Sequence, residues 1–141
     1  MIIIDAKNLI IGRLSTKIAK GLLQGESYII INSEKAVVTG NKIQILEKYK
    51  QDYDKGVPLK GPYFPKKPND ILKRTIRGMV PYKTERGINA MKNLKCYIGF
   101  PKEFEGKDLL TFDDINVDNK RVKSVSLLEI SKKLGYNEVN L

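Results

Sequence analysis

The stretch that decides the fold is residues 2–32, IIIDAKNLIIGRLSTKIAKGLLQGESYIIIN. Its two ends, residues 2–5 and 27–32, are short runs rich in β-branched side chains, which suit strands covered on both faces. Between these runs, apolar side chains recur at every fourth residue, at Leu14, Ile18 and Leu22. This spacing predicts an amphipathic helix, with one side packed on the core and the other exposed to solvent. The stretch therefore predicts a strand–helix–strand unit with parallel strands and a right-handed crossover.

The middle of the chain predicts another helix and then a long loop. We expect the helix over about 41–53, with a core side formed by Ile43, Leu46 and Tyr49. Residues 55–68 are rich in glycine and proline, which cannot sustain a regular ladder. They are expected to form an extended surface loop.

Capping residues place the later elements. Asn69 can cap a helix that runs to about Met79, and Thr84 can cap another that runs to about Leu94. Residues 95–98 predict a strand, and residues 126–134 predict a last helix that ends at Gly135. The polar segment 113–121 gives little regular signal.

Length and composition limit the class of protein. A chain of 141 residues with 41% hydrophobic residues can bury one core, so we expect a single domain over residues 1–141. The absence of histidine removes the usual general base and the commonest metal ligand. Histidine-based triads and most zinc sites are thereby excluded, whereas carboxylate, lysine or bound-magnesium chemistry remains possible. Because no motif indicates such chemistry, we expect no enzyme, no cofactor and no metal site. Cys96 has apolar neighbours and is expected to be a buried, unreactive side chain.

The sequence also gives expectations about location. No run approaches the roughly 20 apolar residues of a membrane-spanning helix. The N-terminus passes from Met1 directly into a strand-like run, without the features of a secretory signal. We expect a cytoplasmic protein without a membrane partner, and nothing indicates a stable homo-oligomer.

The charge is large and localised. A net charge of +10, from 26 Lys and Arg against 16 Asp and Glu, favours a polyanionic partner, with nucleic acid first. Residues 60–95 carry ten basic and two acidic side chains, whereas residues 96–141 carry seven and eight. The loop and helical segment at about 55–95 is therefore predicted to supply a binding face.

The helix expected after Asn69 has two distinct sides. At about 100° per residue, one sector is basic and contains Lys73, Arg74 and Arg77. The opposite sector is apolar and contains Leu72, Ile76 and Met79. Arginine suits phosphate because its planar fork donates two hydrogen bonds. The nearby aromatic side chains either stack on exposed bases or pack beneath the loop: Tyr63, Phe64 and Tyr82.

Three stretches carry a family resemblance. The first holds Ile4-Asp5-Ala6, Gly12-Arg13-Leu14 and Ala19-Lys20, and the second is residues 32–42, NSEKAVVTGNK. The third holds Gly61-Pro62, residues 74–84 (RTIRGMVPYKT) and Arg86-Gly87. Together they resemble the family of large-subunit ribosomal protein thirteen, in its archaeal and eukaryotic form, over roughly residues 2–100. Ile88 and Cys96 depart from the family pattern, and the last forty residues diverge.

The resemblance implies both a fold and a role. The implied fold is a three-layer α/β/α arrangement around a central four-stranded parallel sheet. The implied role is a structural constituent of the large ribosomal subunit, acting early in its assembly, with large-subunit ribosomal RNA and neighbouring ribosomal proteins as partners. The side chains expected to contact RNA are basic: Arg13, Lys60, Lys66, Lys67, Lys73, Arg74, Arg77, Lys83, Arg86, Lys92 and Lys95.

Two other functions remain open. An enzyme of the doubly wound class would bind a nucleotide or an anionic metabolite at the carboxyl edge of its sheet, although no complete nucleotide-binding motif is found. A translational regulator would use the same basic face to bind messenger RNA away from the ribosome.

Overall fold

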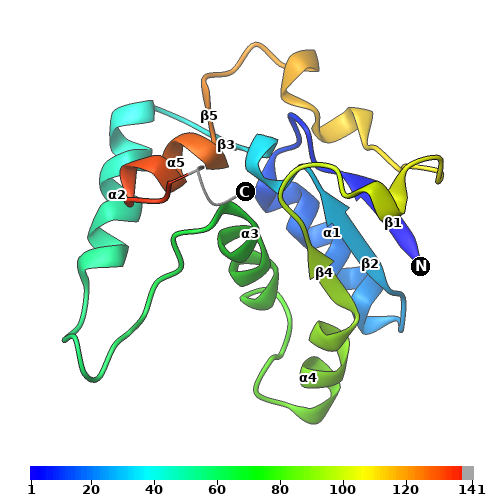
Figure 1. Ribbon diagram of the computed structural model, residues 1–141, viewed down its shortest axis with the longest axis horizontal. Helices are drawn as coiled ribbons and strands as arrows, with labels where there is room; N and C mark the ends of the chain where they lie inside the picture. The colour runs from blue at the N-terminus through cyan, green and yellow to red at the C-terminus, as the bar shows by residue number, and fades with distance from the viewer. Residues whose placement is uncertain (138–141) are drawn as a thin grey trace.

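A parallel sheet of three strands forms the centre of the computed structural model, which describes residues 1–137 (Figure 1). The order is β1 (Ile2–Asp5), β2 (Tyr28–Ile31) and β4 (Leu94–Cys96). Helix α1 (Ile11–Leu23) connects β1 to β2. The strand–helix–strand unit and its parallel pairing are confirmed.

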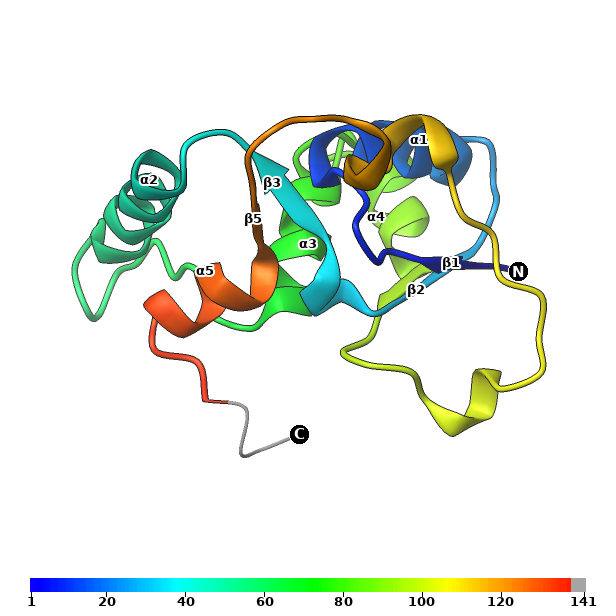
Figure 2. The ribbon, with the colours of Figure 1, turned by 90° about the horizontal axis from the view of Figure 1, so that it is seen from above.

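Helices cover one face of this sheet. The helices α3 (Pro68–Arg77) and α4 (Glu85–Lys92) both pack against α1 and β4, and Figure 2 shows the three helices on the same side of the strands. Ile4 and Ile30 point into this layer and are fully buried. They share one hydrophobic cluster with Leu14 of α1 and with Leu72 and Ile76 of α3.

The opposite face of the sheet has a much smaller cover. It carries Ile3, Ile29 and Ile31, which pack against Phe104 and Tyr97. Phe104 belongs to a 3-10 turn, η2 (Lys102–Phe104), and not to an α-helix. Over residues 1–137, the second helical layer implied by the family resemblance is therefore not confirmed, because a single aromatic turn buries this small isoleucine face.

The predicted four-stranded parallel sheet is also not confirmed in the described residues. The position beside β1 is occupied by Leu110 alone: its N–H donates to the Ile3 carbonyl at 2.8 Å, and its carbonyl accepts from the Asp5 N–H at 3.1 Å. This parallel bridge does not extend into a strand. The chain turns at Gly106, where φ is +80°, and soon enters the 3-10 turn η3 (Asp113–Ile115), so only one residue keeps an extended register.

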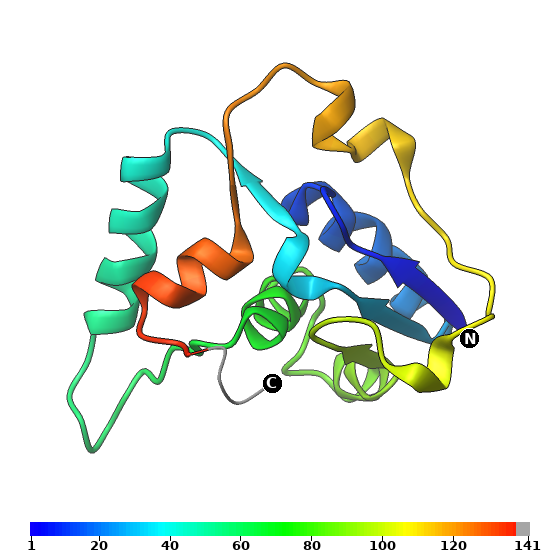
Figure 3. The same ribbon diagram turned by 45° about the horizontal axis from the view of Figure 1, so that its top comes forward.

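A small antiparallel ribbon, which the sequence did not predict, joins two distant segments. It pairs β3 (Val37–Thr39) with β5 (Ser124–Ser126), and the helices α2 (Lys42–Asp54) and α5 (Leu127–Lys133) flank it (Figure 3). Strands of three residues are too short for a periodic signal. Two further 3-10 turns complete the described chain, η1 (Ser33–Lys35) and η4 (Val117–Asn119). No helix within residues 1–137 has both the length and the apolar character needed to cross a membrane.

Two helix starts test the predicted caps. Thr84 caps α4 as expected, since its Oγ1 accepts from the Gly87 N–H at 3.3 Å. Asn69 does not cap α3, which begins at Pro68 after Lys67. Proline suits the first helical position because it lacks an N–H that would remain unbonded there. The Asn69 side chain instead donates to the Cys96 carbonyl at 3.4 Å.

Three predicted core positions are less buried than expected. Met79 is 43% exposed, because α3 ends at Arg77 and the helical spacing no longer applies. Ile43 is 68% exposed, and α2 buries Ile45 instead, because α2 packs against α5 with another side. Cys96 is only partly buried, yet burial raises the pKa of its thiol to about 12, which agrees with an unreactive side chain.

Candidate nucleic-acid interface

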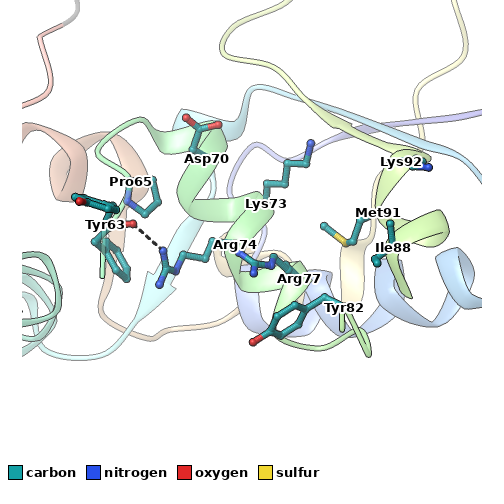
Figure 4. Close-up of a pocket in the computed structure, with 11 residues that line it drawn as sticks. Tyr63, Pro65, Asp70, Lys73, Arg74, Arg77, Tyr82, Ile88, Met91 and Lys92 are labelled. Carbon is teal, nitrogen blue, oxygen red and sulfur yellow. Dashed lines mark hydrogen bonds between the residues drawn. The ribbon is translucent and has the colours of Figure 1, made fainter. Parts of the chain in front are cut away.

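A groove of about 730 Å³ runs along the exposed face of α3, between residues 63–65 and α4 (Figure 4). Its lining contains four cations, Lys73, Arg74, Arg77 and Lys92, and one acid, Asp70. The remaining lining is aromatic or apolar: Tyr63, Phe64, Pro65, Tyr82, Ile88 and Met91. The groove thus combines positive charge with apolar surface.

The amphipathic character of α3 places the cations in the groove. Leu72 and Ile76 are completely buried and hold the helix on the core. Lys73, Arg74 and Arg77 lie on the other side and are exposed. The predicted basic sector is therefore confirmed as an outward face, although the apolar sector includes only the first two of its three expected members.

Contacts with the preceding loop hold Arg74 in position. Its guanidinium carbon lies 4.7 Å from the centre of the Phe64 ring, and its Nη1 donates to the Tyr63 carbonyl at 3.1 Å. Phe64 is itself half-buried and meets Tyr49 of α2 edge to face, with ring centres 6.3 Å apart. Phe64 therefore packs beneath the loop, and Arg74 connects that loop to α3.

Arg77 has a similar aromatic support after the helix ends. Its guanidinium carbon lies 4.3 Å from the centre of the Tyr82 ring. A ring face attracts a cation electrostatically but carries no net charge, so it leaves the positive charge of the guanidinium intact. Tyr63 is 68% exposed at the rim, where its hydroxyl donates to the Pro58 carbonyl at 3.1 Å.

The ion pairs in the described part of the chain involve no residue that lines the groove. They join Lys17 to Asp114, Lys42 to Glu129, Lys50 to Asp54 and Lys55 to Asp52. The groove cations take part in none of these pairs, and Asp70 is the one acid in the groove lining. The positive charge on this face is therefore available to an external anion.

The structure brings together only part of the predicted RNA-contact set. All eleven side chains are exposed, but only Lys73, Arg74, Arg77 and Lys92 line the groove. Lys92 also lines a neighbouring hollow of about 190 Å³ with Lys95 and Met1, so the two hollows share a cation. The other predicted RNA-contact residues line neither the groove nor this hollow: Arg13, Lys60, Lys66, Lys67, Lys83 and Arg86.

Three of these residues have distinct surroundings. Lys66 and Lys67 line a separate hollow of about 450 Å³ near Tyr136. Arg86 extends toward α1, where its Nη2 donates to the Leu23 carbonyl at 3.1 Å. This hydrogen bond joins the start of α4 to the end of α1, so Arg86 has a structural partner that the sequence did not indicate.

Sequence reasoning missed four lining residues, of which one, Pro65, belongs to the predicted loop. Ile88 and Met91 are three positions apart, a spacing that places both on one helix face, so this signal was available. Asp70 follows Pro68 in the first turn of α3, where an acid is favourable at the positive end of the helix. That local role gives no sign that Asp70 also lines a groove.

Comparisons with known proteins identify the family. The family model for ribosomal protein L13 matches residues 1–103. A large ribosomal subunit protein uL13 from Archaeoglobus fulgidus is 46% identical over 139 residues, which cover 97% of this chain and 89% of the relative. Proteins of the same name from Methanosarcina barkeri and Thermoplasma volcanium are each 45% identical, over 96% of this chain and 98% of their own length.

These matches cover the residues that carry the resemblance. The family model spans the stretches at the N-terminus, at residues 32–42 and at residues 61–87, and so includes α3 and α4. The relatives also align through most of the divergent last forty residues. They bear the name of a ribosomal-subunit protein and not of an enzyme, which agrees with the predicted cytoplasmic, non-enzymatic protein. The chain therefore belongs to the ribosomal protein L13 family.

Proposed function

We propose that this chain is a structural constituent of the large ribosomal subunit and binds large-subunit ribosomal RNA through the groove cations. The observation that carries the proposal is the face of α3, on which Lys73, Arg74 and Arg77 are exposed, outside the ion pairs of the described chain. The names of the relatives place those proteins in the large subunit. Similarity over nearly the full chain supports the same assignment here.

Phosphate is the chemical group that this face suits best. The planar forks of Arg74 and Arg77 can each donate two hydrogen bonds to a phosphate, and the aromatic rings beneath them limit their movement. Lys73 and Lys92 add flexible point charges from two different helices. Several such contacts made together release counterions from the RNA, which gives binding that weakens steeply with salt.

The other predicted basic residues form an outer set. We propose RNA contacts at its members, Arg13, Lys60, Lys66, Lys67, Lys83 and Lys95, as the RNA continues beyond the groove. Arg86 also belongs to this set, but its side chain is less free to move toward RNA, because its guanidinium already donates a hydrogen bond to the Leu23 carbonyl.

The loop at residues 55–65 supports a role in assembly. It projects from the body beside α2 (Figure 1), and Leu59 near its tip is 92% exposed, with Val57 at 54%. Apolar side chains at such a tip suit a neighbouring ribosomal protein better than a phosphate backbone. If the loop is fully ordered only by its partners, the ordering entropy opposes binding by the isolated chain. We propose that the protein joins early assembly intermediates, where RNA and protein surfaces are presented together.

Sucrose-gradient sedimentation of the tagged chain from native lysate, with and without a high-salt wash, tests the proposal. Retention with large subunits after the wash is expected of an integral component. A basic protein that is only loosely adsorbed on the RNA dissociates instead, because salt cations compete with it for the phosphates. Migration only at the top of the gradient would contradict it.

A matched pair of triple variants then tests the face of α3. Replacing Lys73, Arg74 and Arg77 by glutamine should lower retention. Replacing Lys42, Lys50 and Lys55, which removes the same charge at ion-paired positions, should leave retention much closer to that of the wild type. Equal losses in the two variants would indicate a response to net charge and not to this face.

A further inference from the structure

We propose that the groove between residues 63–65 and α4 holds one unpaired nucleotide of RNA, with the base against the apolar wall and its phosphates on the cations. The inference rests on the proposed function, because it names the part of the RNA that the groove takes. Two kinds of surface, one cationic and one apolar, line the same groove.

The α4 side of the groove is apolar and exposed. Ile88 is 48% exposed, and Figure 4 shows its side chain and that of Met91 together on α4 beside the groove. Tyr82, at 36% exposure, belongs to the connection between α3 and α4, where it lies beside Arg77 and continues the apolar wall. A phosphate backbone makes no use of such a wall, whereas the face of an unstacked base gains from covering it.

The cations are placed for the phosphates on either side of that base. Lys92 stands on α4 beside the apolar wall, and Lys73 and Arg77 approach from α3 (Figure 4). Asp70 lies at the end of α3 nearer Pro65 and repels phosphate from that end. Its carboxylate can instead accept a hydrogen bond from an amino group of the base.

Size favours a single unpaired nucleotide over a double helix. The groove volume of about 730 Å³ falls within the roughly 300–1,000 Å³ of pockets that hold small organic ligands. A double helix has its bases stacked inside and cannot present one to this wall. The apolar wall also favours a base over an acidic peptide, because the flat face of a base can cover Ile88 and Met91 together.

Photocrosslinking inside assembled ribosomes tests the inference. The chain is expressed in its host with Ile88→p-benzoylphenylalanine, and large subunits are purified on a gradient and irradiated. The same replacement at Ile43, an isoleucine of α2 that is 68% exposed and does not line the groove, is the control. Crosslinked RNA positions are read as stops of reverse transcription. We expect a strong stop at one unpaired nucleotide for position 88 and its absence for position 43.

The outcomes separate this inference from the proposed function. Crosslinks from position 88 only to base-paired nucleotides, or only to another protein, would overturn the unpaired-nucleotide site while the chain still sediments with large subunits. Failure to sediment in the wild-type chain would overturn the proposed function itself. If the Ile88 variant does not enter subunits, the same probe is placed at the rim residue Tyr63, which is 68% exposed. Its crosslinks distinguish unpaired from base-paired nucleotides in the same way.

A second measurement addresses the stacking surface. In subunits carrying Tyr82→Ala, the crosslinked nucleotide should become several-fold more reactive toward a base-modifying reagent, and Tyr82→Phe, which keeps the ring, should restore its protection. Equal reactivity in the wild-type, alanine and phenylalanine subunits would show that no base rests against this wall.

Discussion

Helices α1 and α3 have the same amphipathic design but different surroundings for their cations. Both bury leucine and isoleucine in the same cluster beside the sheet. On α1, Lys17 pairs with Asp114 at 2.9 Å and lies 4.6 Å from the centre of the Phe112 ring. On α3, Arg74 and the terminal Arg77 rest on aromatic rings and take part in none of the ion pairs within residues 1–137. The difference teaches that the partner of a cation, and not the amphipathic pattern, decides whether that cation remains available for binding.

The largest expected effect tests the similarity of the two helices. Leu14 of α1 and Leu72 of α3 are both completely buried. Leu14→Ala and Leu72→Ala should each lower the free energy of unfolding by about 2–5 kcal/mol, from lost apolar burial and the cavity that remains. Urea denaturation followed by circular dichroism measures both. A loss below 1 kcal/mol at only one site would show that the two helices do not share one core equally.

The next effect tests the difference in charge. Lys73→Gln with Arg77→Gln should flatten the dependence of log affinity on log salt by roughly 0.7 to 0.9 for each lost phosphate contact. Lys17→Gln with Lys20→Gln on α1 removes the same charge and should change this slope little, because Lys17 already has an acidic partner. The measurement is release of labelled protein from purified large subunits over a salt series. An unchanged slope in the α3 pair would refute its assignment.

A smaller effect comes from two glycines at the helix starts. A Cβ at Gly87 of α4 would come within 1.9 Å of the Pro81 carbonyl oxygen, whereas a Cβ at Gly12 of α1 meets nothing within 4 Å. Gly87→Ala should therefore destabilise by about 1–3 kcal/mol, because the backbone must shift. Gly12→Ala should stabilise by about 0.5–1 kcal/mol, as expected for alanine in a helix. Thermal unfolding compares the two variants. A Gly87→Ala variant as stable as the wild type would disprove the close approach of Gly87 to the Pro81 carbonyl.

The smallest effect concerns the ion pair of α1. The hydrogen bond from Lys17 lowers the pKa of the exposed Asp114 carboxyl from its ordinary value. A carboxyl whose folded pKa is depressed contributes stability above its unfolded pKa, and this contribution is lost as pH falls through the folded pKa. Lys17→Met should therefore raise the Asp114 midpoint in an NMR titration of the carboxyl carbon. An unchanged midpoint would mean that Asp114 does not depend on Lys17 in solution.

Sequence patterns predicted the elements whose contacts are local or strongly periodic. The unit over residues 2–32, the outward basic face of α3 and the Thr84 cap all follow from spacing along a few turns of chain. The family was predicted from its three stretches, and the comparisons confirm it. Ile43 and Met79 show the limit, because a spacing of apolar residues states neither where a helix ends nor which side meets its neighbour.

The candidate site was predicted in composition but not in arrangement. Ten basic side chains over residues 60–95 indicated a binding face, yet the structure gathers only four of the predicted cations in the groove. Arg86 instead reaches the end of α1. A count of charges along the chain does not show which cations line the groove and which contact another element. Both depend on which segments of the chain meet in the folded protein.

The sequence by itself determined the amphipathic helices, the buried parallel strands, the basic face of α3 and the family, because each is encoded within a short run of residues. Only the tertiary structure decided that β3 pairs with β5, that Leu110 supplies a single bridge beside β1, and that Ile88 and Met91 face the cations of α3. These features join residues distant in the chain, and their stability comes from the packing of the whole molecule and not from local preference.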